Sequence, residues 1–150
     1  MEREIKFRLI KYIAFLESEL QDFSNFRSLL WEGYHKDRSK RRDVERWVEN
    51  IINSSIDISK ILLVSEKISA PDTYKELVAS ISLVPGFDKE QMDELSNWVR
   101  FRNIIAHEYL DIRWASIKKF IDEAEPLYRS FLRNVKEYLD RQLETSPAKE

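Results

Sequence analysis

The sequence contains no cysteine and has only two glycines and four prolines among its 150 residues. Without cysteine, disulfide scaffolds and metal sites built on thiolates are excluded. Glycine and proline supply most of the tight turns that a β-sheet protein needs in large number. Their scarcity therefore favours a small number of long helices.

Long hydrophobic runs are also missing. No apolar run approaches the roughly 18 residues that a membrane span requires. The first six residues, Met1 to Lys6, alternate charged and apolar side chains and do not form the apolar core of a signal peptide. We therefore expect a cytoplasmic protein that has no membrane partner.

The chain carries no excess of positive charge. Its 25 Lys and Arg against 27 Asp and Glu give a net charge of −2, which is not typical of a protein that binds nucleic acid over its whole surface. Any contact with RNA must come from a local basic patch. Two groups are candidates: the run Lys36, Arg38, Lys40, Arg41 and Arg42, and the trio Arg100, Arg102 and Arg113. The first run is also typical of a solvated segment that opens a helix.

Apolar residues recur every three or four positions along most of the chain, which is the spacing of amphipathic helices. We expect a helix-ending signal at Gly33, another at Pro71, and a kink or break at Pro126. The expected helices span 4–30, 39–68, 73–84, a segment from 88 through 105, and 111–142. The sequence thus predicts an all-α antiparallel bundle of four or five helices, with one domain over 1–144 and a frayed tail over 145–150.

The polar chemistry is concentrated between Trp98 and Tyr109, in the stretch WVRFRNIIAHEY. Arginine keeps its charge and binds phosphate oxygens in pairs, whereas histidine titrates near neutrality and transfers protons. Arg102 and His107 therefore fit RNA cleavage in which a ribose 2′-hydroxyl attacks the adjacent phosphate. Asn103 fits a role in contacting phosphate or orienting a neighbour, and Tyr109 fits stacking or hydrogen bonding to RNA.

Two observations limit this interpretation. Two histidines without cysteine argue against a structural zinc site, so we expect no metal ion. The sequence has neither a P-loop nor a Rossmann fingerprint, and we expect no cofactor. Five residues along a regular helix also rotate a side chain by about 140°, so Arg102 and His107 converge only if the helix ends near Ala106. A structural role fits the same spacing, because a histidine near a helix C-terminus often caps carbonyls.

At these residues the sequence resembles the HepT-like branch of the HEPN superfamily. The signature of that branch is an arginine, four to six residues, a histidine, one residue and a tyrosine, which Arg102, His107 and Tyr109 meet. Asn103 supplies the polar residue that often follows the arginine. The resemblance runs from about Glu4 to Leu139 and includes the segments Arg42–Arg46, Asp57-Ile58, Pro71–Tyr74 and Phe101–Ile104.

The resemblance implies a HEPN-like bundle that forms a homodimer and brings two motifs together at the subunit interface. It implies a metal-independent endoribonuclease, the toxin of a type VII toxin–antitoxin pair, with Arg102 and His107 catalytic. The antitoxin would be a small nucleotidyltransferase of the MntA type that silences the toxin by transferring AMP to Tyr109. Asn103 and Arg100 would have supporting roles, and Arg100 lies outside the signature.

Two other interpretations remain open. The acidic net charge and the long apolar stripes also fit a non-catalytic helical module that docks a nucleotidyltransferase without cutting RNA. A purely structural bundle, in which the motif ends a helix, is the second. We expect the four tryptophans to lie in the core or at a dimer interface, not to stack on bases; they are Trp31, Trp47, Trp98 and Trp114.

Overall fold

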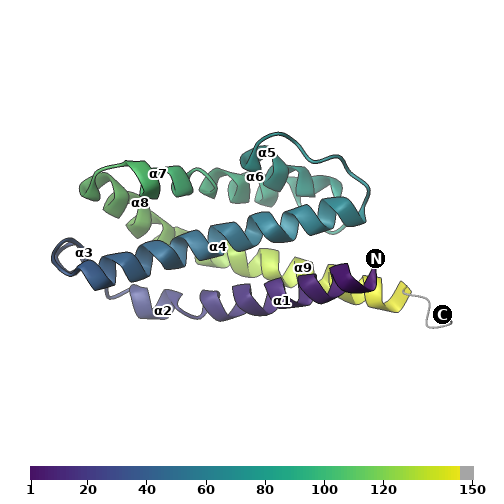
Figure 1. Ribbon diagram of the computed structural model, residues 1–150, viewed down its shortest axis with the longest axis horizontal. Helices are drawn as coiled ribbons and strands as arrows, with labels where there is room; N and C mark the ends of the chain where they lie inside the picture. The colour runs from purple at the N-terminus through teal and green to yellow at the C-terminus, as the bar shows by residue number, and fades with distance from the viewer. Residues whose placement is uncertain (146–150) are drawn as a thin grey trace.

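The computed structural model describes residues 1–145, and that part of the chain is helical throughout apart from short connections (Figure 1). The prediction of an all-α fold is therefore confirmed. The expected tail begins at Thr145, which is the last residue of a helix; positions 146–150 lie outside the described residues. Among residues 1–145, none of the helices combines the length and the apolar character that crossing a bilayer demands.

The longest helix runs through the middle of the molecule, and the others lie around it (Figure 1). This helix, α4, contacts α1 on one side and α5, α7 and α8 on the other, while α9 lies against α1, α6 and α8. The described α-helices are α1 (Arg3–Leu20), α2 (Phe23–Phe26), α3 (Trp31–Lys36), α4 (Arg38–Ser65), α5 (Tyr74–Ala79), α6 (Lys89–Trp98), α7 (Phe101–His107), α8 (Leu110–Glu123) and α9 (Glu125–Thr145), with a short 3₁₀ helix over Ser80–Leu83.

The helix expected over 4–30 is divided, and this corrects the prediction. Polar side chains after Leu20 bond locally: Ser24 donates to the carbonyl of Gln21 at 3.1 Å, and Asn25 donates to the Asp22 carboxylate at 2.9 Å. Such bonds compete with the regular helical ladder. They turn the chain so that Phe23 enters the core.

Gly33 does not end a helix, contrary to the prediction, because it lies inside α3. The boundary falls instead at Asp37, whose backbone is extended and whose carboxylate accepts hydrogen bonds from the amides of Ser39 and Lys40 at 3.0 and 3.2 Å. Such an N-cap satisfies amides that have no helical partner and so sets the first residue of α4.

Two predicted boundaries are confirmed. The Thr73 hydroxyl accepts a hydrogen bond from the Glu76 amide at 3.1 Å and caps α5. The helix expected over 111–142 is broken near Pro126, because α8 ends at Glu123 and α9 starts at Glu125. Proline is tolerated in the first turn of a helix, where its missing N–H would have no partner.

A buried aromatic cluster joins the helices beneath the motif. The Phe120 ring lies 5.6 Å from the rings of Phe23 and Trp47 and 5.4 Å from that of Trp98. Of the tryptophans, Trp47 is buried in the core as expected, and Trp98 and Trp114 are partly buried against it. Trp31 remains 40% exposed.

Candidate functional site

The motif lies on α7, which is separated from α6 by a tightened turn at Val99 and Arg100. The amides of Val99, Arg102 and Asn103 each bond to the carbonyl three residues earlier, at 3.1–3.2 Å, instead of four. This 3₁₀-type geometry interrupts the single helix that we expected from residue 88 and gives α7 a start of its own.

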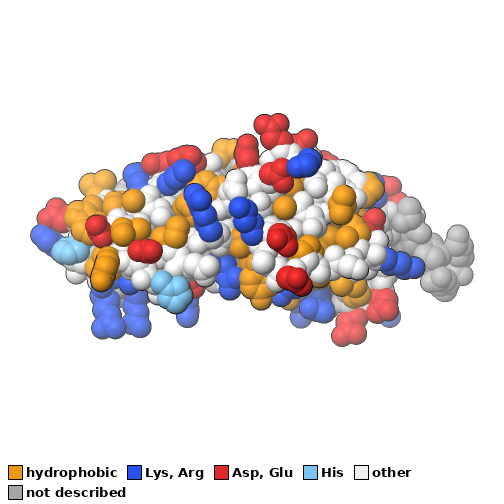
Figure 2. Space-filling model, turned by 90° about the horizontal axis from the view of Figure 1, so that it is seen from above, with side chains coloured by type: hydrophobic (Ala, Val, Ile, Leu, Met, Phe, Trp, Pro, Cys, Tyr) orange, Lys and Arg blue, Asp and Glu red, His pale blue; other side chains and the backbone are white. Residues whose placement is uncertain are grey.

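Two apolar side chains attach α7 to the bundle. Phe101 and Ile105 are each 4% exposed and lie one turn apart, so they share the face that meets the core. The polar residues take the remaining directions. Arg102 is half-buried, while Asn103 and His107 are exposed. Figure 2 views the molecule from the side of α5, α6 and α7, and Lys and Arg side chains lie along the middle of that face.

The helix stays regular through His107, and the Glu108 amide still bonds to the carbonyl of Ile104 at 3.0 Å. The early helix end that would let Arg102 and His107 converge is therefore absent. Five residues apart on one helix, the two side chains leave the axis about 140° apart. In one copy of the chain, the end of the helix therefore does not direct the Arg102 and His107 side chains at the same phosphate.

The turn after α7 is held by Arg113 from α8. The Arg113 Nε donates to the carbonyl of Glu108 at 2.7 Å, and its Nη1 lies 3.1 Å from the Glu45 carboxylate on α4. Glu45 also accepts a 2.5 Å hydrogen bond from the hydroxyl of the fully buried Tyr34 on α3. Burial, reinforced by this bond to Glu45, raises the pKa of Tyr34 well above its ordinary value, which keeps the hydroxyl a donor.

His107 and Tyr109 extend from this turn into solvent. Tyr109 is 82% exposed and has an extended backbone, and His107 is exposed at the last position of α7. Within residues 1–145, no side-chain hydrogen bond or ion pair engages either of them. His107 therefore does not cap carbonyls with its ring, which was the structural alternative for this residue. Both groups are available to a ligand.

The arginines of the motif have different surroundings. The guanidinium carbon of Arg102 lies 5.0 Å from the centre of the Tyr74 ring on α5. Arg100 is exposed, lies over the ring of Phe101 and lines a separate surface hollow with Trp98 and Lys119. Asn103 is exposed on the outward side of α7. The structure thus brings Arg102 and Tyr74 together, and directs Arg100 elsewhere.

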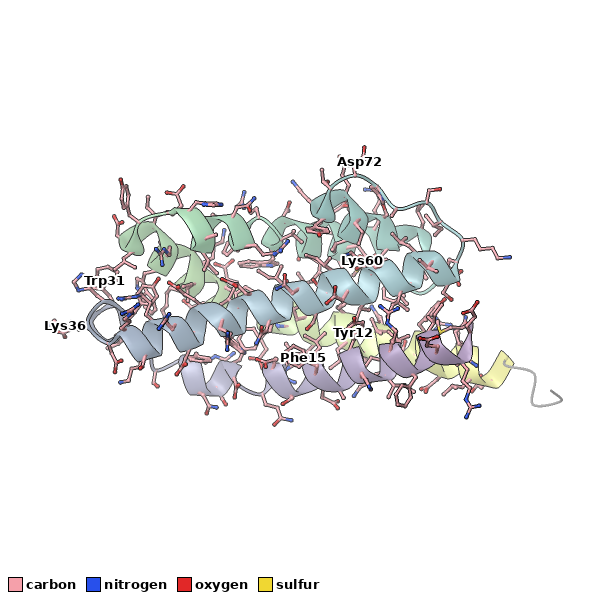
Figure 3. All side chains as sticks on the ribbon, viewed as in Figure 1. Tyr12, Phe15, Trp31, Lys36, Lys60 and Asp72 are labelled. Atoms are coloured by element: carbon pink, nitrogen blue, oxygen red, sulfur yellow. The ribbon has the colours of Figure 1, made fainter. Side chains whose placement is uncertain are left out.

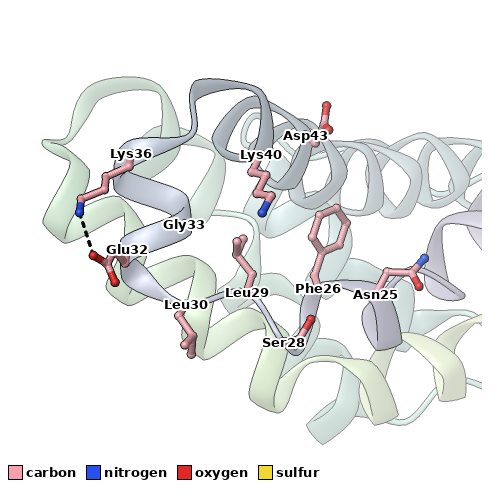
Figure 4. A pocket seen from close by; sticks show the side chains of 10 residues that line it. All are labelled: Asn25, Phe26, Ser28, Leu29, Leu30, Glu32, Gly33, Lys36, Lys40 and Asp43. Carbon is pink, nitrogen blue, oxygen red and sulfur yellow. Dashed lines mark hydrogen bonds and ion pairs between the residues drawn. The ribbon is translucent and has the colours of Figure 1, made fainter.

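The basic run before α4 lies apart from the motif. Lys36 pairs with Glu32 at 2.8 Å, and Arg41 donates to the carbonyls of Tyr34 and His35, so both side chains help to hold α3. A groove between α2, α3 and the start of α4 is lined by Phe26, Leu29 and Leu30 together with polar and charged side chains, Lys36 and Lys40 among them (Figure 4). The run does open a helix, since α4 begins at Arg38, as the alternative interpretation expects, but Lys36 and Arg41 are held in contacts and are not simply solvated.

Two features of this site were not predicted as functional. Tyr74 and Glu45 lie in segments that carry the family resemblance, but periodicity shows only that they fall on helices and not what they contact. Among residues 1–145, no three His, Asp or Glu side chains are grouped so as to hold a metal ion.

The comparisons with known proteins agree with the all-helical fold. The model of the family described as "Ribonuclease HepT-like" matches residues 10–135. A tri-AMPylated Shewanella oneidensis HEPN toxin, solved in complex with its MNT antitoxin, superposes with a TM-score of 0.74 at 15% identity, covering 91% of this chain and 99% of that one. A toxin–antitoxin solved with AMP-PNP gives 0.70 at 15% identity, covering 90% and 99%.

At this identity the two structures establish a common fold. No curated protein sequence matches the chain. The family model covers most of the sequence, including the whole stretch from Arg102 to Tyr109. The chain therefore belongs to the HepT-like ribonuclease family.

Proposed function

We propose that this protein is a metal-independent endoribonuclease, the toxin of a type VII toxin–antitoxin pair that acts in the cytoplasm. The observation that carries the proposal is that the Arg102 and His107 side chains form no hydrogen bond or ion pair among residues 1–145. Arg102 has no carboxylate partner among the described residues, and His107 is exposed and unbonded at the end of a well-anchored helix. One helix thus carries a cation and a proton-transfer group, and neither is engaged in an ion pair within the described residues.

The reaction assigned to this pair is transesterification of RNA. The ribose 2′-oxygen loses its proton and attacks the adjacent phosphorus, the bond to the 5′-oxygen breaks, and that oxygen gains a proton. The products carry a 2′,3′-cyclic phosphate and a 5′-hydroxyl. His107 carries one of the two proton transfers. Arg102 binds the phosphate oxygens and stabilises the charge that develops on them, with Asn103 and Arg100 as supporting contacts.

The active form in this proposal is a homodimer. Arg102 and His107 of one copy point about 140° apart on α7. One copy therefore places one of the two side chains on a given phosphate more readily than both. A two-fold axis beside α7 would place Arg102 of one copy next to His107 of the other. Each dimer would then contain two equivalent sites.

The proposed control point is Tyr109. A nucleotidyltransferase of the MntA type would transfer AMP to its hydroxyl, which is 82% exposed and lies two residues from His107. The added nucleotide would bring bulk and negative charge beside the motif and block the approach of an RNA phosphate. The extended backbone at Tyr109 presents the hydroxyl outside any helix, where a second protein can reach it.

The test is cleavage of labelled single-stranded RNA in buffer containing EDTA. Wild type should produce cyclic-phosphate and 5′-hydroxyl ends. His107→Ala and Arg102→Ala should each lose at least about 10²-fold in rate. His35→Ala is the matched control, because it removes the only other histidine, which stacks on Trp31 at 4.8 Å. Wild type that leaves RNA intact would favour the non-catalytic docking module, and cleavage that survives His107→Ala would exclude the assigned role.

A further inference from the structure

Three helices bring two cations to one aromatic ring beside the motif. The Lys60 ammonium on α4 and the Arg102 guanidinium on α7 each lie 5.0 Å from the centre of the Tyr74 ring at the first position of α5. The two cations are therefore no further apart than twice that distance. Figure 3 shows Lys60 on the part of α4 that lies beside α5.

The ring is held in place by local structure. The Thr73 hydroxyl caps α5 one residue before Tyr74, and Leu77 and Val78 of the same helix are buried in the core. Tyr74 itself stays 45% exposed. Its face attracts both cations through the ring quadrupole but does not neutralise them.

The two cations of this cluster are not engaged in ion pairs in the part of the chain that the structure describes. Within residues 1–145, neither Lys60 nor Arg102 has a carboxylate at ion-pair distance, whereas Lys36, Lys89, Lys118 and Lys136 each have one. Asp57 lines the same surface hollow as Lys60 but makes no ion pair with it. Two cations that share one ring and have no ion-pair partner among the described residues favour the approach of a polyanion, whose neighbouring phosphates can contact them separately.

We propose that Lys60, Tyr74 and Arg102 form a second RNA-phosphate subsite that continues the cleavage site along α4 and α5. Lys60 binds the phosphate next to the scissile one, and Tyr74 is a positioning residue that orients both cations. The ligand is a flexible single strand, whose consecutive phosphates track a line of cations. This inference rests on the proposed ribonuclease function, because it takes Arg102 as the residue on the scissile phosphate.

Binding tests the subsite separately from catalysis. In the full-length His107→Ala protein, fluorescence anisotropy of a short fluorescein-labelled single-stranded RNA is measured over a series of salt concentrations. Lys60→Gln should weaken binding about fivefold and reduce the salt slope by roughly one phosphate contact. Lys11→Gln is the matched control, because Lys11 also lies over an aromatic ring, that of Phe7 at 4.8 Å, on α1. Its affinity should equal that of the parent.

Tyr74 is tested through its ring. In the otherwise wild-type protein, Tyr74→Leu should lower kcat/KM for RNA at an unchanged melting temperature, and Tyr74→Phe should restore it because the ring is retained. Equal effects of Lys60→Gln and Lys11→Gln, or a parent that binds no RNA, would overturn the subsite. A protein that binds RNA through Lys60 but never cleaves it would overturn the proposed function and leave the subsite standing.

Discussion

Arg113 and Glu108 are joined by a 2.7 Å hydrogen bond from the guanidinium Nε to the backbone carbonyl, and this bond fixes the turn between His107 and Tyr109. The same guanidinium is paired with Glu45 on α4. The part of the motif that carries the exposed histidine and tyrosine is thus tied to the central helix by one side chain that lies outside the signature.

The Arg113 network should contribute measurably to stability. Arg113→Ala leaves Glu45 partly buried without its cation and should lower the free energy of unfolding by about 1–3 kcal/mol. Lys118→Ala breaks an exposed pair with Asp122 on the same helix and should change it by no more than about 0.5 kcal/mol. Urea denaturation at neutral pH measures both. Equal urea midpoints for the two variants would show that the Arg113 network does not contribute to stability.

Mixing two inactive variants tests whether the active site is shared between copies. If Arg102 of one copy acts with His107 of the other, a heterodimer of Arg102→Ala and His107→Ala chains retains one intact site. After unfolding and refolding of an equal mixture, RNA cleavage should return to roughly a quarter of the wild-type rate, because half the dimers are mixed. Each variant refolded alone is the control. If a mixture that is shown to contain heterodimer recovers no RNA cleavage, the site is not shared between copies.

Transfer of AMP to this protein should be confined to Tyr109. Co-expression with an MntA-type nucleotidyltransferase should add one or more AMP groups to the wild-type chain, seen by intact mass, and the modified protein should no longer cut RNA. Tyr109→Phe should carry no addition. Tyr74→Phe, which removes another exposed tyrosine hydroxyl, should be modified normally. AMP found on Tyr109→Phe would place the control point elsewhere.

Glu125 should make stability depend on acid pH. Burial raises the pKa of this carboxyl, but hydrogen bonds and charge from Arg129 and Arg27 outweigh burial and hold it below the ordinary value of 4.5. A group whose pKa is lowered on folding stabilises the fold above its unfolded pKa and loses that contribution as pH falls through the folded pKa. At pH 7 the free energy of unfolding of the wild type should therefore exceed that of Glu125→Gln by about 0.5–1.5 kcal/mol.

That difference should shrink as the pH falls below 4.5, when the carboxyl of the wild-type protein becomes protonated. Urea midpoints of both proteins, measured across this range, give the comparison. Glu144→Gln serves as the control, because it removes an exposed carboxyl near the end of α9. A difference between wild type and Glu125→Gln that stays constant from pH 7 to the acid limit would contradict the assignment.

Local features of the sequence predicted the helices and several of their ends. Apolar spacing and Pro126 act within one or two turns, so their effects can be inferred without knowing the fold. The same reasoning failed between Leu20 and Trp31. In that segment the apolar spacing predicts one helix. Local side-chain hydrogen bonds and the packing of Phe23 in the aromatic cluster divide it.

For the candidate site, the sequence by itself determined which residues carry the chemistry: Arg102, His107 and Tyr109 are recognised by identity and spacing along the chain. Only the tertiary structure decided their surroundings. It kept α7 helical through His107, brought Tyr74 and Lys60 to Arg102 from two other helices, and tied the turn to Glu45. These contacts join residues far apart in sequence, and their partners depend on how the helices pack, which the period of a single helix does not encode.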